Sequence, residues 1–245
     1  MHPSTDGSTW HRTRLLALCA LLGLGANAVA AADELKPFAA SYEWTWKGMT
    51  VAVSSVKLEK SGDTWTYTSS SEPRGIGKMF SERPHMVSVL KITSAGVQPQ
   101  SYKATDGTSA DKRGVDLKYD WTNHRLTGVS EQVPIDLALT PDVQDDASVQ
   151  VALMVESLAG RVPDHFSLLS DNKLRVYHYK REGEATVKTP FGDVATVIFS
   201  SHADYSPRTT RFWCAPDRGY VPMRVEQKKD EDVQWTMDIK SFTRN

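Results

Sequence analysis

The chain has 245 residues, of which 40% are hydrophobic and 24% are charged, and its formal net charge at pH 7 is −1. This composition is typical of a globular protein, and the sequence has no sustained basic block that would indicate a nucleic-acid partner. The chain is long enough to bury a sizeable hydrophobic core.

The N-terminal segment has the pattern of a cleavable export signal. Arg12 and Arg14 precede an apolar stretch, residues 15–24, that is too short to span a bilayer. Ala28-Val29-Ala30 is a small-x-small cleavage site, with residues 30–32 as a neighbouring option. We therefore expect a signal peptide over residues 1–30, cleavage near Ala30 to Ala32, no transmembrane segment in the mature chain and a periplasmic location in a Gram-negative envelope.

Cleavage would leave Cys214 as the single cysteine, so no intramolecular disulfide is expected. Cys214 lies in the apolar segment 212–216, and no neighbouring histidine or CxxC pattern would lower its pKa. A buried small hydrophobic residue is the favoured interpretation, and a reactive thiol is the alternative.

Alternating apolar and polar residues predict strands through the first half of the mature chain. Tyr42, Trp44 and Trp46 share one phase of residues 41–47, which is typical of a half-buried strand. The apolar phase changes at Ser54-Ser55, which predicts a β-bulge. Further strands are expected from Trp65, over residues 85–92 and 98–105, and in a hairpin formed by residues 115–121 and 124–130.

Residues 73–84 interrupt the strand pattern with two prolines and two glycines. Ile76, Met79 and Phe80 are the apolar residues of this segment. A connecting loop that carries an apolar plug is the favoured interpretation, because ordinary loops are much commoner than lids. A gate over a cavity, with glycine hinges and an apolar tip, is the alternative.

Residues 146–160 (DASVQVALMVESLAG) form the one long segment with helical spacing. Five apolar residues make one stripe, namely Ala147, Val151, Met154, Val155 and Leu158. Asp145 or Asp146 can cap the first turn, and Gly160 provides the left-handed stop. Val149 and Leu153 lie on the other side among polar residues, so we expect that face to be partly exposed. Packing against a sheet is favoured over a mobile lid or a partner-binding helix.

The remainder of the chain returns to strands, expected over residues 173–182, 184–188, 194–201, 209–214, 220–227 and 233–240. About twelve strands and one helix, without an internal repeat or a linker, predict a mainly β protein with a single β-rich domain over residues 31–245. The expected architecture is one large curved antiparallel sheet, or an open or flattened β-barrel, with the helix packed on its concave face. A β-sandwich is the alternative.

No motif in the sequence identifies a catalytic residue, a metal site or a cofactor. GxSxG, HExxH, GxxxxGK[ST], GxGxxG and paired CxxC motifs are all absent. The histidines after the signal show no metal-ligand spacing in the sequence, and they are His85, His124, His165, His178 and His202. The sequence therefore favours a protein without enzymatic activity, metal or cofactor.

Two features suggest ligand binding. Aromatic residues recur in the apolar phase of the strands, which fits either a well-filled core or a cavity for a lipid-like ligand. Arg211 and Arg224 could face each other across the last hairpin, either in salt bridges or as a site for an anionic head group. The candidate ligand-binding residues are Trp44, Trp46, Trp65, Met79, Phe80, Trp121, Trp213, Arg211 and Arg224.

The C-terminal half resembles a family of exported bacterial proteins known as domain-of-unknown-function family 3108. The resemblance is carried by the acid-Ser start and Gly stop of residues 145–160, by Tyr177-His178-Tyr179, by the turn at residues 189–192, and by residues 210–213 leading to 219–224. It extends more loosely over residues 35–243. The resemblance implies a periplasmic β-rich protein and assigns no functional residue. The layout is also similar to the lipoprotein carriers of the bacterial envelope, an analogy of fold alone.

These observations favour non-enzymatic binding of an apolar or amphiphilic cell-envelope ligand on the concave side of the sheet. A structural or adaptor protein that acts through its surface is the first alternative. A hydrolase of envelope glycans is the second, and it requires two carboxylates within about 10 Å in a cleft, one with a raised pKa.

Overall fold

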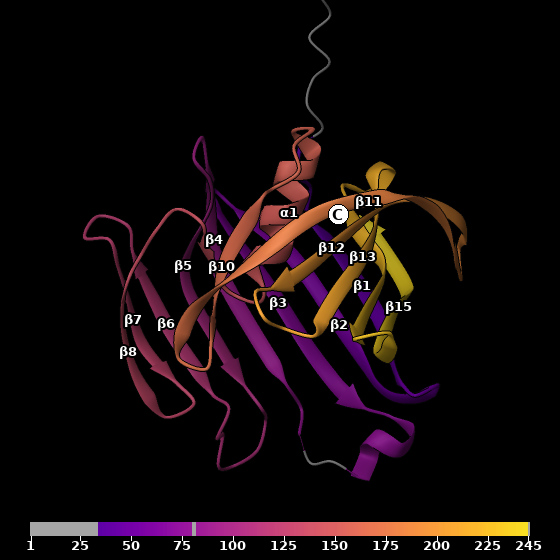
Figure 1. The fold of residues 1–245 in the computed structure, drawn as a ribbon, viewed down its shortest axis with the longest axis horizontal. Coiled ribbons are helices and arrows are strands. Elements are labelled where there is room, and N and C mark those ends of the chain that lie inside the picture. Colours follow the sequence, from indigo (N-terminus) through magenta and orange to yellow (C-terminus); the bar gives the residue numbers. More distant parts are fainter. Residues whose placement is uncertain (1–33, 80–81, 245) are drawn as a thin grey trace, which may run out of the picture. The chain divides into compact units, whose positions relative to one another are not determined.

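The computed structural model describes residues 34–79 and 82–244 (Figure 1). The predicted signal peptide and Phe80 therefore lie outside the described residues. Within those ranges the chain forms one 15-stranded sheet, one α-helix and two short 3-10 helices. The helices are α1 (Ser148–Leu158), η1 (Gly75–Met79) and η2 (Pro216–Arg218).

The strand order is a simple meander that passes through the paired chain ends. It runs β8-β7-β6-β5-β4-β3-β2-β1-β15-β14-β13-β12-β11-β10-β9, and neighbours are antiparallel except for the short parallel pair of β9 and β10. The strands are β1 (Phe38–Trp46), β2 (Met49–Ser61), β3 (Thr64–Pro73), β4 (His85–Thr93), β5 (Gly96–Thr105), β6 (Val115–Asp120), β7 (Arg125–Ser130), β8 (Val133–Ala138), β9 (Val143–Gln144), β10 (His165–Ser170), β11 (Lys173–Thr189), β12 (Gly192–Ala203), β13 (Arg208–Ala215), β14 (Val221–Lys229) and β15 (Asp232–Arg244).

The sheet must roll up, because its two edge strands are consecutive in the chain. Only residues 139–142 connect the end of β8 to the start of β9. Five Cα steps reach at most about 18 Å, whereas the edges of a flat sheet of this many strands would lie on the order of 65 Å apart. Leu139 N–H donates to the carbonyl of His124 (2.9 Å), which fixes the start of this link against the β6–β7 turn. The prediction of a large curved antiparallel sheet is confirmed.

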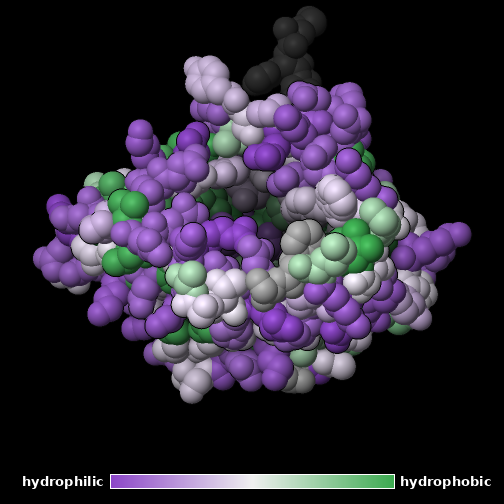
Figure 2. Space-filling view, turned by 90° about the horizontal axis from the view of Figure 1, so that it is seen from below, coloured by the Kyte–Doolittle hydropathy of each residue, from purple (hydrophilic) through white to green (hydrophobic). Residues whose placement is uncertain are grey.

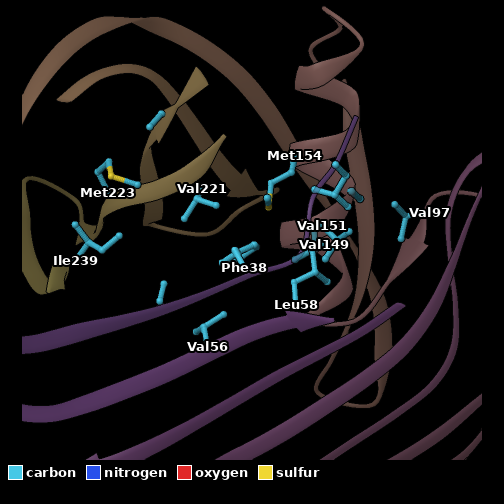
Figure 3. Close-up of a cluster of buried hydrophobic side chains, with 14 of the residues drawn as sticks. Phe38, Val56, Leu58, Val97, Val149, Val151, Met154, Val221, Met223 and Ile239 are labelled. Atoms are coloured by element: carbon cyan, nitrogen blue, oxygen red, sulfur yellow. The ribbon is translucent and has the colours of Figure 1, made fainter. Parts of the chain in front are cut away.

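Helix α1 fills the concave side of the rolled sheet. Leu58 from β2 and Phe38 from β1 lie beside Val149 and Val151 of the helix (Figure 3). The predicted stripe faces this core, but the expectation that the face carrying Val149 and Leu153 is partly exposed is wrong. Leu153 is only 2% exposed, because β12, β13 and β14 cover that side with Phe199, Phe212 and Val225. Both apolar faces of α1 are therefore packed against strands.

The ends of α1 follow from its local sequence. Asp145 Oδ1 accepts hydrogen bonds from the backbone N–H groups of Ala147 (3.0 Å) and Ser148 (2.7 Å). Ser148 Oγ in turn accepts one from the N–H of Asp145 (2.9 Å), which makes a reciprocal capping box. Of the two proposed capping residues, Asp145 therefore carries the cap. Gly160 ends the helix with a φ of 71°, as predicted.

Several strand predictions need correction. Three of the strands, β8, β9 and β10, are absent from the strands that the sequence predicts. Residues 173–182 and 184–188 form one strand, β11, whose register against β12 shifts between Arg181 and Gly183. β10 reads HFSLLS, which alternates poorly, because Phe166, Ser167 and Leu168 are all buried.

The bulge of β2 lies before the predicted position. The register between β1 and β2 shifts between Trp44 and Thr45, so the extra residue is Val51 and not Ser54 or Ser55. Ser54, Val56 and Leu58 share the buried face, so the phase does not change at Ser54. A serine stands at an inward position because its Oγ accepts a hydrogen bond from Trp44 Nε1 (2.6 Å).

Truncating Leu153 tests whether this side of α1 belongs to the core. We expect Leu153→Ala to lower the free energy of unfolding by ~2–5 kcal/mol, because the change leaves a cavity between the helix and β12–β14. The exposed Val162, which follows the helix, provides the control, and Val162→Ala should change stability by less than ~0.5 kcal/mol. Urea unfolding followed by circular dichroism measures both values. Equal effects of the two variants would show that this face of the helix is not packed.

Candidate functional site

A cavity of about 210 Å³ lies at the N-terminal end of α1, between the helix and the concave face of the sheet. Seen from below, the molecular surface is hollowed, with a largely hydrophilic rim and hydrophobic residues in its depth (Figure 2). The residues that line the cavity come from both halves of the sheet and from the helix. They are Phe38, Tyr42, Trp44, Ser54, Val56, Tyr67, Ser69, Met86, Asp146, Gln150, Met154, Thr210, Phe212, Pro222, Val225, Trp235 and Met237.

Most of this lining is apolar and aromatic. Trp44 on β1 and Trp235 on β15 approach with ring centroids 4.8 Å apart, and Phe212 on β13 adds a further aromatic ring. Val56 and Met154 are buried residues of the main core cluster that also reach the cavity. Such a surface favours hydrocarbon or ring groups of a ligand, which leave water when they enter.

The helix supplies the polar part of the lining. Asp146, Gln150 and Met154 follow one another at intervals of four residues, so they lie on one face of α1 and its first turn. The side-chain amide of Gln150 makes no hydrogen bond within the described part of the chain, although Gln150 is half-buried. The cavity therefore presents hydrogen-bonding groups whose capacity the protein does not use.

Asp145 and Asp146 occupy different surroundings although they are adjacent. Asp145 is buried, and its Oδ2 accepts a hydrogen bond from Ser88 (2.8 Å) and lies 3.5 Å from the Tyr119 hydroxyl. Asp146 is exposed, and its Oδ2 accepts a hydrogen bond from the Tyr102 hydroxyl (3.4 Å). Asp145 thus caps the helix, whereas Asp146 borders the cavity and also, with Tyr102, a smaller space of about 30 Å³.

Partial loss of hydration raises the pKa of both carboxyl groups, more strongly for the buried Asp145 than for the exposed Asp146. Removal from water raises the pKa of Asp145 to about 7, against the opposing effect of hydrogen bonds from Ser148 and Ser88. Partial desolvation also raises the pKa of Asp146, and the hydrogen bond from the Tyr102 hydroxyl opposes this rise. Burial likewise raises the pKa of the Tyr102 hydroxyl, so it stays protonated and can donate.

The pair of carboxyl groups does not form the site that a glycan hydrolase requires. A raised pKa and a short separation match part of that expectation, but Asp145 Oδ1 is bound to two backbone N–H groups of the helix. Asp145 lines a separate space of only about 30 Å³, roughly one water molecule in size. Asp145 is therefore not placed to act on a sugar in the larger cavity.

The proposed aromatic ligand residues lie in different places. Trp44 lines the cavity. Trp65 lines a separate depression near the C-terminal end of α1, beside Ile92 and Leu158. Trp46 is 43% exposed, Trp121 donates from Nε1 to the carbonyl of Pro99 (2.6 Å), and Trp213 packs half-buried against the main core cluster.

The segment expected to be a connecting loop with an apolar plug connects β3 to β4, and its described residues do not line the cavity. Residues 75–79 form η1, in which Met79 is 87% exposed and Ile76 is also exposed, and neither of them lines the cavity. The interpretation of these two residues as a buried apolar plug is therefore wrong.

The two candidate arginines are paired with acids on the sheet. Arg211 Nε lies 2.8 Å from Glu182 Oε2, and Arg224 Nε lies 2.6 Å from Asp238 Oδ1. They do not face each other, because Arg211 stands opposite Glu226 and Arg224 stands opposite Trp213. Salt bridging, the favoured interpretation, accounts for both. Neither lines the cavity.

The strand register also brings together three histidines that are far apart in the sequence. His165, His178 and His202 stand side by side on β10, β11 and β12, with ring centroids 6.3 and 5.7 Å apart. Asp164 and Asp204 lie within 3.4 Å of ring nitrogens of His165 and His178. Among the described residues no group of three His, Cys, Asp or Glu side chains is arranged to hold a metal ion.

Sequence reasoning missed most of the cavity. Phe38, Phe212, Asp146 and Gln150 were not proposed as ligand-binding residues. Asp146 and Gln150 could have been noticed in the sequence, because they are polar residues four apart that share one face at the start of the helix. Phe38 and Phe212 had none, because a strand sequence does not show which inward residues border an unfilled space.

The fold and the cavity define a class of protein in which an open, rolled β-sheet encloses a helix and leaves space beside it. A solved structure with a similar fold is that of a β-barrel-like protein of domain of unknown function DUF1849 from Brucella abortus. It is 12% identical to this chain, with a TM-score of 0.59, and the match covers 86% of this chain and 99% of that one. At this identity the likeness shows the fold alone.

Residues 41–237 match the family described as "Protein of unknown function (DUF3108)", and the chain belongs to that family. The resemblance noted in the C-terminal half is thereby confirmed and extends over most of the chain. No curated protein sequence matches the chain. In the part of the chain that the structure describes, no helix is long and apolar enough to cross a membrane.

The raised pKa of Asp145 predicts an unusual pH dependence of stability. The folded-state pKa of about 7 exceeds the ordinary value of 3.8, so the folded protein binds the proton more tightly than the unfolded chain does. Stability should therefore fall as pH rises from about 4 to about 7, by up to ~1.4 kcal/mol per pH unit from this group. Asp145→Asn should flatten that slope.

Urea unfolding at a series of pH values measures this slope, and Asp193→Asn, at an exposed position on β12, is the control that keeps it. Asp106, Asp120 and Asp142 have lowered pKa values, so their contribution to stability is lost at lower pH, below about 4. An unchanged slope in Asp145→Asn would show that Asp145 ionises normally in the folded protein.

Proposed function

We propose that this protein binds a small amphiphilic molecule of the cell envelope in the cavity at the N-terminal end of α1. The observation that carries the proposal is an apolar, aromatic lining that also contains, on one face of the helix, the Asp146 carboxylate and the Gln150 side-chain amide. The protein's own hydrogen bonds leave much of the hydrogen-bonding capacity of these two groups free. A protein core that served stability alone would be expected to fill such a space, because interiors are packed to the density of organic crystals.

The size of the cavity limits the ligand. At about 210 Å³ it is larger than an engineered cavity of ~150 Å³ that binds benzene and smaller than the ~300–1,000 Å³ of drug-sized sites. One ring system, or the end of an acyl chain that continues through the opening, fits this space. The apolar part would contact Phe38, Phe212 and Met154, and the polar part would reach Asp146 and Gln150.

The predicted export signal supports an envelope ligand. A chain that is exported to the periplasm meets lipids, their degradation products and other amphiphiles of the two membranes. A structural or adaptor role through the surface remains the alternative hypothesis, and it predicts that the cavity stays empty. The occupancy of the cavity therefore separates the two.

Cavity filling provides the decisive test. The purified protein should bind a fluorescent acyl probe, and native mass spectrometry should detect an amphiphile that copurifies from the periplasm. We expect Val225→Phe, which places a ring in the cavity, to weaken probe binding by at least about tenfold, equivalent to ~1.4 kcal/mol.

The matched control is Val233→Phe on β15, where the side chain is exposed and does not line the cavity. Both variants are checked for folding by circular dichroism, because overpacking costs ~1–3 kcal/mol. Absence of probe binding by the wild-type protein, together with absence of a copurified amphiphile, would rule the proposal out.

A further inference from the structure

We propose that the cavity selects amphiphiles whose polar end is a cation of the ammonium class, and not fatty acids or other anions. This inference rests on the proposed function and names the chemistry of its ligand. It follows from the charges that line the cavity, from the partners of Asp146 and from the occupied N–H groups at the start of α1.

The lining carries one acid and no base. Among its residues, Asp146 is the sole member of the Asp, Glu, Lys, Arg and His types. A carboxylate or phosphate inside the cavity would therefore face a like charge without a counter-charge, which disfavours binding. The arginines that could have neutralised an anion, Arg211 and Arg224, are bound to acids on strands of the sheet.

Asp146 itself lacks a cationic partner within the described residues. Its contact is the Tyr102 hydroxyl at 3.4 Å, and no Lys, Arg or His forms a salt bridge with it in the described part of the chain. The titratable groups around it are Asp145 beside it and the hydroxyls of Tyr67, Tyr102, Tyr119 and Tyr179. A bound cation would supply the missing positive charge.

The usual anion-binding feature at a helix N-terminus is already occupied. Free N–H groups of a first turn attract anions, but here Asp145 accepts the N–H groups of Ala147 and Ser148 with its side chain. The N–H groups of Val149 and Gln150 donate to the carbonyls of Asp145 and Ala147. None of the N–H groups of residues 147–150 is therefore left for an anionic head group.

The aromatic lining complements a cation. Trp44, Trp235, Tyr42 and Tyr67 border the same cavity as Asp146. Aromatic faces attract alkylammonium groups through the ring quadrupole, and combinations of aromatic rings with a carboxylate recognise quaternary ammonium ligands. An anion gains nothing from these faces.

Competition among three amphiphiles of equal chain length tests the inference. Decyltrimethylammonium, decanol and decanoate, each below its micelle concentration, displace the fluorescent acyl probe from the full-length protein at pH 7.5. We expect the ammonium compound to bind at least about tenfold more tightly than decanol, and decanoate to bind most weakly. The affinity for the ammonium compound should rise with pH as Asp146 ionises, because the charged carboxylate is the form that attracts it.

Asp146→Asn removes the charge with little change in shape. It should abolish both the preference for the ammonium compound and the rise of its affinity with pH, whereas the affinity for decanol, which carries no charge, should change much less. Asp193→Asn, which makes the same charge change at an exposed position outside the cavity, should retain both. If Asp146→Asn does not fold, Gln150→Glu replaces it as the test, since a second carboxylate on the same face should increase the preference.

The outcomes separate this inference from the proposed function. Decanoate binding as tightly as the ammonium compound, or a preference that persists in Asp146→Asn or does not increase in Gln150→Glu, overturns the inference and leaves amphiphile binding in place. Failure of the protein to bind the probe or any of the three compounds overturns the proposed function itself.

Discussion

The short link between β8 and β9 is the constraint on which the architecture depends. Residues 139–142 join strands that stand at opposite edges of a 15-stranded sheet, so the sheet can form only if it rolls until those edges meet. Rolling creates a concave interior, and the chain places its one apolar helix there directly after β9. The helix thus completes a core that the sheet alone would leave hollow.

The helix does not fill that interior completely, and its sequence decides where space remains. On most sides α1 carries Val, Leu, Ala and Met against the strands, and these contacts are dense. On the line of Asp146, Gln150 and Met154 it carries two polar side chains, which could not enter an apolar core without partners. The cavity lies along that line. Asp145 holds the first turn in place, so the position of Asp146 follows from the capping box.

The fold could be predicted from the sequence because its elements are local. Alternation defined most strands, and spacing defined α1 together with its Gly160 stop. β9 and β10 were not predicted because β9 has only two residues and β10 alternates poorly. β8 does alternate, with Val133, Ile135 and Leu137 in one phase, and could have been predicted. The cavity could not be predicted because it depends on contacts between strands that are distant in the sequence. Trp44, Trp65 and Trp213 look equivalent in the sequence, but the curvature and register of the sheet place them differently. Trp44 lines the cavity, Trp65 lines another depression, and Trp213 packs against the core.

The pairing of β1 with β15 has a consequence for the order of assembly. Ser41 and Ser241 share a hydrogen bond across a sequence separation of 200 residues, in the middle of the sheet. During synthesis, the meander from β1 to β8 therefore keeps an open edge at β1 until β15 has been made. Joining such distant segments is entropically slow. The two meanders are thus expected to form separately, and closure at β1 and β15 to be the late step that shields their edges from other chains.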